Sequence, residues 1–462
     1  MATEADALPL PDTGRLPVYA QSLNRSIVKL AWPVVLERLS LSALSAVDAA
    51  LVGRYVGSDG IAAVGIGALL FWIPLAGALA IDVGTSAVIA RDVGAGDRSR
   101  VQAGLHAALL TAFAWGLICA TVIFAFAPQF MRWMGADSDV APKGVDFLRA
   151  GALGLPFMML FYAISGSLRG MGNAWMSMVI LFVVNAANAL TTFLLISGAA
   201  ADLGMRASGI GYATAGVVGG LLALALLLSG IAPLRLNPFA IFKTDRSSFQ
   251  RLGRIGLPVG LEEGQFMLAF LVYTRIVSSL GTEQLAAHAV ALRSLEIAIL
   301  PGFALGTAAT ALVGQSLGAG DPQRAEDVAK RVRFFAVCAL SVMAVAQFAL
   351  APYVVRLFIE DSDTEVIETG TKLLRVFAIA MPGMAIHASL SGALRGAGDV
   401  RFVLGAFMFT AWGVRVPLAA IIALPLGLSV PFVWLAAVTE NWTRAALTTW
   451  RFRSGKWKSM KV

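Results

Sequence analysis

Charged residues are scarce in this chain: Asp, Glu, Lys and Arg make up 14% of its 462 residues, whereas apolar residues make up 58%. An ordinary soluble domain has about 25% charged and about 45–50% apolar residues. A water-soluble globule cannot bury so much apolar surface, and a disordered chain requires low hydrophobicity. We therefore expect an all-α polytopic membrane protein whose helices contact lipid.

Cysteine and histidine are also rare, with two cysteines, Cys119 and Cys338, and three histidines. No CxxC pair or metal-ligand spacing occurs, so we expect no disulfide framework, no metal centre and no cofactor. The absence of a Walker motif excludes a recognisable nucleotide-driven motor. The net charge of +8 is not gathered into a basic, aromatic-rich stretch, so we expect no nucleic-acid partner.

Long stretches with few charges predict twelve transmembrane helices. With both termini assigned to the cytoplasm, 24 of the 36 Lys and Arg residues fall on the cytoplasmic side and 9 on the opposite side. This asymmetry predicts a multi-pass protein of a prokaryotic plasma (inner) membrane with both termini cytoplasmic. The expected spans are 27–53, 61–81, 107–131, 150–168, 170–201, 207–234, 255–279, 284–314, 334–355, 372–394, 400–423 and 429–448.

The chain repeats itself at an offset of about 225 residues. Gly94-Ala95-Gly96-Asp97 recurs as 318–321, Ser165-Gly166-Ser167-Leu168-Arg169-Gly170 recurs with one change as 391–396, and the segment 32–37 resembles 257–262. Six spans per half make the repeat parallel, and transporters with such halves commonly bind substrate between them. We expect the Gly-Ala-Gly-Asp segments to end one helix and cap the next.

This repeat divides the chain into five parts around an expected central cavity. They are a disordered cytoplasmic leader (1–26), an N-terminal six-helix lobe (27–234), a cytoplasmic inter-lobe linker (235–254), a C-terminal six-helix lobe (255–450) and a basic cytoplasmic tail (451–462).

Several motifs together resemble the multidrug and toxic compound extrusion (MATE) family, in a prokaryotic DinF-like or related branch. They are Val47-Asp48-Ala49-Ala50-Leu51-Val52-Gly53, the two Gly-Ala-Gly-Asp turns, the two Ser-Gly-(Ser/Ala)-Leu-Arg-Gly turns and the segment 308–315. The resemblance implies two six-helix lobes and export of organic cations or other amphipathic compounds, driven by H⁺ or Na⁺. It also implies that Asp48 belongs to the proton or cation site. Asn188 matches an Asn of that site, but Thr192 stands where those branches often have an Asp, so the second carboxylate is missing.

Asp48 is the strongest candidate for ion coupling among the intramembrane ionisable residues. A charge at bilayer depth costs about 2.5–3.5 kcal/mol and by default marks a functional site. Asp48 has no basic residue three or four positions away, so it either exchanges a proton or, when ionised, holds Na⁺. The alternative is a carboxylate bonded to a neighbouring helix for packing alone.

Asn185 and Asn188 share one helix face, because they are three residues apart. Their amides either complete the ion site beside Asp48 or act only as interhelical hydrogen bonds.

Other charges within the spans are candidates for a substrate cavity. Glu37 and its repeat counterpart Glu262 either attract cationic substrates or form gate and packing contacts, for instance with an arginine of a neighbouring helix. Asp82 is a further cavity candidate. Arg293 and Glu296 either line the cavity or neutralise one another at positions i and i+3.

The remaining ionisable groups are expected to be structural. Arg415 is expected to pair with an acidic residue of the second lobe, and His288 and His387 are expected to pack or hydrogen-bond.

These observations favour a monomeric secondary-active exporter of small molecules by proton or sodium antiport with alternating access. The alternatives are a flippase for lipids or lipid-linked substrates and, less supported by three histidines, an integral-membrane enzyme.

Overall fold

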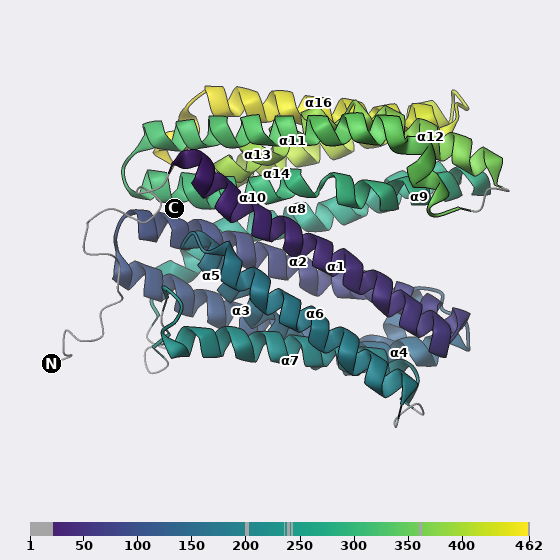
Figure 1. Ribbon diagram of the computed structural model, residues 1–462, viewed down its shortest axis with the longest axis horizontal. Coiled ribbons are helices and arrows are strands. Elements are labelled where there is room, and N and C mark those ends of the chain that lie inside the picture. The colour runs from purple at the N-terminus through teal and green to yellow at the C-terminus, as the bar shows by residue number, and fades with distance from the viewer. Residues whose placement is uncertain are drawn as a thin grey trace. The chain divides into compact units, whose positions relative to one another are not determined.

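The computed structural model describes residues 22–198, 203–234, 236–237, 241, 244–359 and 363–460. Helices form the regular structure of these residues, and no strand occurs among them (Figure 1). Residues 1–21 of the expected leader, part of the expected linker and the last two residues of the tail lie outside the described residues.

The helices fall into two compact units. The first contains Leu36–Gly256, and the second contains Ser22–Val35 and Leu257–Val462, so that α1 and α8 each contribute to both. The helices of the first unit are α1 (Leu23–Tyr55), α2 (Ser58–Gly94), α3 (Arg98–Trp133), α4 (Val140–Ala152), α5 (Leu155–Gly170), α6 (Ala174–Ser197) and α7 (Met205–Ser229).

The second unit repeats this order. Its helices are α8 (Arg246–Ser278), α9 (Thr282–Ala298), α10 (Leu300–Gly318), α11 (Pro322–Arg356), α12 (Thr364–Ala378), α13 (Met381–Ala397), α14 (Val400–Thr410), a π-helical turn (Ala411–Arg415), α15 (Val416–Ala423), α16 (Val430–Arg453) and a final 3₁₀ turn (Lys456–Ser459).

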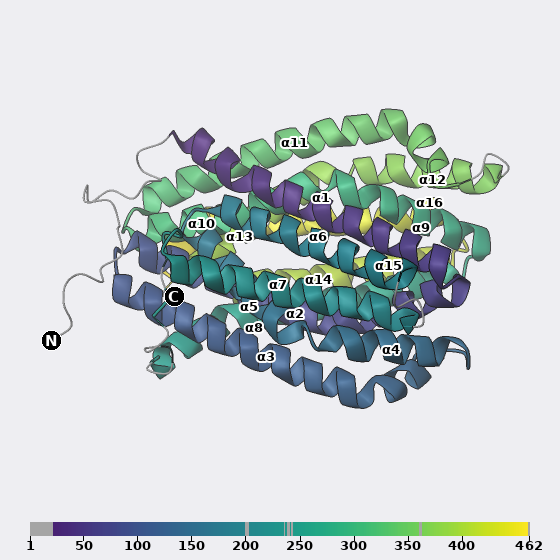
Figure 2. The same ribbon diagram turned by 60° about the horizontal axis from the view of Figure 1, so that its bottom comes forward.

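Each unit has its own packing arrangement. In the first unit, α6 packs against α7, and α5 packs against both α2 and α3. In the second unit, α10 packs against α13 (Figure 2). Within the described part of the chain, seven helices are long and apolar enough to cross a membrane, and the number of spans rises to as many as ten if each bent pair counts as one. The charge-bearing helices α1 and α16 complete the order of twelve. Large side chains such as Val342 and Val345 of α11 are exposed, as lipid-facing residues would be.

Three of the expected continuous spans are wrong in detail, because each is a pair of helices with a bend. The angles are 52° between α4 and α5, 45° between α9 and α10, and 50° between α12 and α13. In each case a proline, Pro156, Pro301 or Pro382, lies in the first turn of the second helix. Proline suits a helix start but cannot continue the preceding helix, which explains the breaks.

The expected helix stops and caps at the Gly-Ala-Gly-Asp segments are confirmed. Gly96 and Gly320 adopt positive φ values of 71° and 72°, where a glycine is favoured. The carboxylates of Asp97 and Asp321 then accept hydrogen bonds from the N–H groups of Arg100 at 3.0 Å and Arg324 at 2.9 Å. These are N-caps of α3 and α11.

The sequence predicted turns at the two Ser-Gly-(Ser/Ala)-Leu-Arg-Gly segments, and this prediction is wrong. The segments are helical and lie at the C-terminal ends of α5 and α13. Their glycines allow close helix packing. A Cβ on Gly170 would lie 2.7 Å from the carbonyl oxygen of Ser86, and a Cβ on Gly396 would lie 2.3 Å from that of Thr310. Small residues spaced by four allow backbones to approach in this way.

Asp245 marks the start of α8. Its carboxylate accepts hydrogen bonds from the Ser247 and Ser248 hydroxyls and from the Ser248 N–H, and these bonds lower the pKa of Asp245.

Candidate functional site

A buried ionic cluster joins four helices of the first unit. Arg169, at the end of α5, donates from one guanidinium nitrogen to Glu37 of α1 at 2.9 Å and from the other to Asp82 of α2 at 2.6 Å. The Ser177 hydroxyl of α6 donates to the second carboxylate oxygen of Glu37 and accepts from Arg169 at 3.1 Å. No residue of the cluster is more than 8% exposed.

Glycine packing places Arg169 within reach of Asp82. A Cβ on Gly166 of α5 would lie 2.4 Å from the Asp82 carbonyl oxygen, so this contact between α2 and α5 admits no side chain there. With the helices at this separation, the Arg169 guanidinium extends directly to the Asp82 carboxylate. The expected spans 150–168 and 170–201 place Arg169 in the connection between them, and its repetition at Arg395 is the sequence signal that could have identified its role.

The second unit contains an equivalent of half this cluster. Arg395 of α13 donates to Glu262 of α8 at 2.7 Å, at nearly the same offset that relates the sequence motifs. Gly306 occupies the position equivalent to Asp82, and its carbonyl oxygen would lie 2.1 Å from a Cβ on Gly392. At this position of the repeat, the first unit therefore pairs two carboxylates, those of Glu37 and Asp82, with the single arginine Arg169.

Asp48 differs from these ion-paired carboxylates. Its Oδ1 atom is enclosed and has no hydrogen-bond partner among the described residues. The side chain is half-buried late in α1. Three turns of helix separate it from Glu37, which corresponds to about 16 Å along α1.

Asn185 and Asn188 lie on the buried side of α6. The Asn185 amide donates to the Ser40 hydroxyl of α1, and Asn188 is 2% exposed. The Asn188 side-chain oxygen accepts a hydrogen bond of 3.4 Å from the Thr192 hydroxyl, which would lie only 2.0 Å from a Cβ on Gly211 of α7. The described residues show no hydrogen bond from either asparagine to Asp48.

Arg293 and Glu296 lie together on α9, with 4.0 Å between their charged groups. Their side chains are 68% and 56% exposed in the second unit. Such an exposed pair contributes little to stability.

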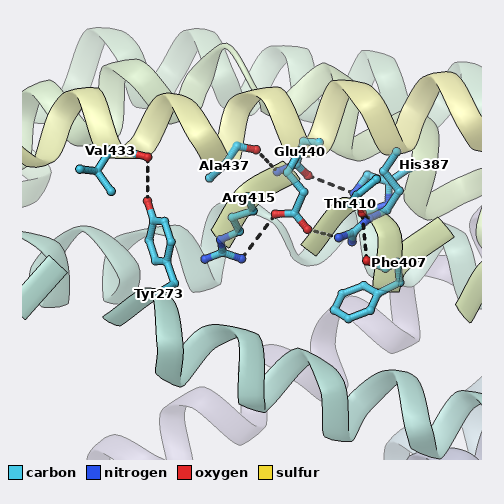
Figure 3. Close-up of polar contacts among 10 residues, drawn as sticks. Tyr273, His387, Phe407, Thr410, Arg415, Val433, Ala437 and Glu440 are labelled. Carbon is cyan, nitrogen blue, oxygen red and sulfur yellow. Dashed lines mark hydrogen bonds and ion pairs between the residues drawn. The ribbon is translucent and has the colours of Figure 1, made fainter. Parts of the chain in front are cut away.

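Arg415 was expected to pair with an acidic residue of the second lobe. That residue is Glu440 of α16, at 3.5 Å (Figure 3). Glu440 also pairs with Arg444, which donates to the Thr410 hydroxyl at 3.0 Å. The guanidinium of Arg415 lies 4.2 Å from the ring centroid of Tyr273, a cation–π contact. The π-helical turn ends at Arg415 and shifts the register of the helix just before this contact.

The network of Glu440, Arg415 and Arg444 was not predicted from the sequence, although the i, i+4 spacing of Glu440 and Arg444 is visible there. The expected hydrogen bonding of two histidines is confirmed: His387 contacts the Asn441 side-chain oxygen at 3.1 Å, and His288 accepts from Trp434 at 3.1 Å. The described residues contain no group of three or more His, Cys, Asp or Glu side chains arranged to hold a metal ion.

Comparison with known proteins supplies the family. The MatE family model matches residues 33–194 and again residues 258–421. The chain belongs to the MatE family. The two matches begin 225 residues apart, at the offset of the internal repeat, and together they cover most of both units. The resemblance to MATE transporters seen in the sequence is thereby confirmed.

Relatives and solved structures agree with this assignment. The chain is 23% identical to a probable multidrug resistance protein NorM of Thermotoga maritima, over 95% of this chain and 94% of the relative. It is 22% identical to the uncharacterized transporter YisQ of Bacillus subtilis, over 94% of each. It resembles an outward-facing multidrug resistance MATE family transporter of the MOP superfamily with a TM-score of 0.88, at 20% identity, covering 94% of this chain and 97% of that one.

These similarities establish the fold class and the general activity. The MatE chain is an all-α polytopic protein with the twelve-helix, two-lobe layout of MATE transporters. It is a multi-pass membrane protein of a multidrug efflux family, which comprises transporters and not enzymes.

Proposed function

We propose that this MatE protein is a secondary-active exporter of organic cations or other amphipathic compounds. It exchanges them for H⁺ or Na⁺ by alternating access, as a monomer in the plasma membrane with both termini cytoplasmic. Membership of a multidrug efflux family and the internal repeat support this proposal. Inward movement of one cation down 100 mV releases about 2.3 kcal/mol, which is available to drive export.

The observation that carries the proposal is the state of Asp48. The intramembrane carboxylates of Glu37, Asp82, Glu262 and Glu440 each pair with at least one arginine. Asp48 instead has an enclosed oxygen with no hydrogen-bond partner among the described residues. An unpaired carboxylate at this depth is unfavourable unless a proton or a metal cation neutralises it, so Asp48 is suited to exchange such an ion.

We propose that Asn185 and Asn188 support this exchange from α6. Asn185 ties α6 to α1 through Ser40, and Asn188 is held by Thr192. A rearrangement of α1 against α6 would bring amide oxygens toward Asp48, and such a rearrangement is a means by which ion binding shifts the conformational equilibrium. Of the cavity candidates, Glu37, Asp82 and Glu262 are paired with arginines and therefore contact a cationic substrate only if those pairs open.

The test is transport in everted vesicles under separately imposed proton and sodium gradients, with a panel of cationic dyes. We expect one of the two gradients to drive dye accumulation in the wild type, and we expect the Asp48→Asn variant to accumulate no more dye than protein-free vesicles. Asp59→Asn is the matched control, because Asp59 lies near the start of α2 and pairs with Lys143 on the surface.

Unchanged ion-driven accumulation by Asp48→Asn would remove Asp48 from the mechanism. Dye movement indifferent to both gradients would contradict antiport as a whole.

A further inference from the structure

The second unit carries an open groove between the first turns of α12 and α16. Its volume is about 790 Å³, within the range of sites for small molecules. Gln284 of α9 fixes the start of α16 beside it, because its side-chain oxygen accepts a hydrogen bond of 2.6 Å from the Val430 N–H. The side chains that give the groove its chemistry are Glu365, Glu368, Lys372 and Arg375 of α12 and Phe432 and Leu435 of α16.

Charged side chains follow a definite order along the groove face of α12. From the start of the helix inward, the acids Glu365 and Glu368 come first, and the bases Lys372 and Arg375 follow. Lys372 and Arg375 are three residues apart and share a face. The opposite wall on α16 is apolar and exposed, as a lipid-facing surface would be. The groove thus presents negative charge at its outer end, positive charge further in and an apolar wall beside them.

Arg375 is held by an aromatic ring instead of by an acid. Its Nε atom donates to the carbonyl oxygen of Phe348 on α11 at 3.4 Å, and its guanidinium lies 5.4 Å from the centroid of the Phe348 ring. Arg375 makes no ion pair among the described residues. A guanidinium has five N–H donors, and this contact uses only one of them. The contact therefore orients the group and leaves donors available for an anion.

The first unit repeats this contact. The Nε atom of Arg149 on α4 donates to the Phe124 carbonyl oxygen of α3 at 3.2 Å, and its guanidinium lies 5.5 Å from the Phe124 ring centroid. Arg149 and Phe124 precede Arg375 and Phe348 by about the offset of the internal repeat. The same geometry in both units indicates that the arginine position belongs to the framework and is not an accident of one surface.

The two units differ one turn away from this arginine. Lys372 of the second unit corresponds in the repeat to Asp146 of the first, which pairs with Arg206 at 2.9 Å. Two neighbouring bases therefore occur at this place only in the second of these two sites. A pair of bases on one helix face is suited to bind a phosphate group, with the arginine supplying parallel N–H donors.

Arg375 lies at the depth of lipid phosphates. α11 has 35 residues and is about 52 Å long, whereas the hydrocarbon core of a bilayer is about 30 Å thick. About 11 Å of helix extends beyond each side of a core centred on α11. Phe348 lies about 12 Å before the last residue of α11, Arg356. The guanidinium that contacts Phe348 is therefore at the boundary between hydrocarbon and headgroups.

We propose that this groove binds one phospholipid with a zwitterionic, primary-ammonium headgroup, namely phosphatidylethanolamine. Lys372 and Arg375 hold the phosphate, and Glu368 and Glu365 accept hydrogen bonds from the ammonium group. The acyl chains lie against the apolar wall of α16. The existing pair of Glu368 and Lys372 is exposed, with 2.6 Å between its charged atoms, and such a pair costs little to open.

The order of charges favours this headgroup over others. In phosphatidylethanolamine the ammonium lies outside the phosphate, which matches acids outside bases along α12. Phosphatidylglycerol offers the phosphate but no cation, so the two acids would repel it. A choline headgroup has no N–H group to donate to a carboxylate.

Site-specific photocrosslinking of the full-length protein tests the proposal. We replace Phe432 by p-benzoylphenylalanine, irradiate the protein in dodecyl maltoside micelles with rising fractions of dioleoyl phosphatidylethanolamine, and measure the attached lipid by mass spectrometry. We expect the yield to saturate. Arg375→Gln should require about ten times more lipid for half of that yield, because it removes charge-assisted hydrogen bonds to the phosphate.

A competition experiment identifies the headgroup. With equal amounts of dioleoyl phosphatidylethanolamine and dioleoyl phosphatidylglycerol, the probe at Phe432 should attach mainly the first lipid. The double change Glu365→Gln, Glu368→Gln leaves two bases without acids, so we expect it to reverse the preference. The same probe at Val342, an exposed residue of α11 outside the groove, should attach both lipids equally in every variant.

Arg206→Gln is the matched control for loss of an exposed arginine, because Arg206 pairs with Asp146 in the first unit. It should saturate at the same lipid fraction as the parent. An unchanged saturation curve in Arg375→Gln would overturn the phosphate site. Equal attachment of both lipids at Phe432, or a preference for phosphatidylglycerol in the parent, would overturn the assigned headgroup. The experiment uses no gradient and no transported compound, so its outcome is independent of the proposed export.

Discussion

Glu440 is the acid with which two partly buried arginines of the second unit pair. Arg415 and Arg444 are both within contact of its carboxylate, and their side chains are 13% and 14% exposed. Glu440→Gln keeps the shape but leaves both guanidiniums without an anion. We expect a loss of about 3–5 kcal/mol in the free energy of unfolding, as for other broken buried pairs. Denaturant titration in mixed micelles measures it.

Variants of Arg415 and of a surface acid allow the loss in unfolding free energy to be compared with that of Glu440→Gln. Arg415→Met should destabilise less, because Glu440 and Arg444 then remain as a balanced pair. Glu368→Gln is the surface control: Glu368 pairs with Lys372 one turn away, with side chains 70% and 57% exposed. We expect that change to leave the free energy of unfolding nearly unchanged, because exposed pairs contribute little to stability. Equal losses in Glu440→Gln and Glu368→Gln would mean that the buried network contributes nothing specific.

At the scale of helices, the contacts of α2 with α5 and of α10 with α13 depend on glycine. A Cβ on Gly170 or Gly396 would lie 2.7 or 2.3 Å from a carbonyl oxygen of the facing helix. Gly170→Ala and Gly396→Ala therefore force the helices apart, and we expect each to lower the free energy of unfolding by about 1–3 kcal/mol. Thermal unfolding followed by tryptophan fluorescence would show the order of the variants.

Gly405 of α14 is the matched control, because a Cβ there meets nothing within 4 Å. Gly405→Ala should instead stabilise by about 0.5–1 kcal/mol, since alanine loses less backbone entropy in a helix. The close-contact interpretation is wrong if all three alanine variants behave alike.

Hydropathy was sufficient to predict the helices but not their bends. Long apolar stretches locate spans because of the bilayer thickness, yet Pro156 and Pro382 are compatible with either a kink or a new helix. The capping role of Asp97 was predictable because it depends on residues adjacent in the chain. The Arg169 cluster was not, because Arg169 lies 132 residues from Glu37 and 87 from Asp82, and their approach depends on glycine packing between helices.

At the scale of the whole chain, the two repeats share a framework but differ in charge. Arg169 with Glu37 and Arg395 with Glu262 are equivalent pairs. The first unit adds Asp82 and the unpaired Asp48, whereas the second adds the arginine-rich contact at Glu440. Asp48, whose enclosed Oδ1 atom has no hydrogen-bond partner among the described residues, thus lies in the first repeat, so we expect ion exchange to involve the first unit more than the second.

The orientation of the chain makes a final prediction, because the excess of Lys and Arg assigns the Gly-Ala-Gly-Asp turns to the cytoplasm. Ser99 follows the first of these turns, and Ser138 lies in the connection at the other end of α3; both are exposed. In a Cys119→Ala, Cys338→Ser background, a membrane-impermeant maleimide added to whole cells should label the Ser138→Cys variant and not the Ser99→Cys variant. Everted vesicles should give the opposite pattern, which excludes a merely unreactive cysteine. Labelling of Ser99→Cys from outside intact cells would reverse the orientation that the excess of Lys and Arg assigns to the chain.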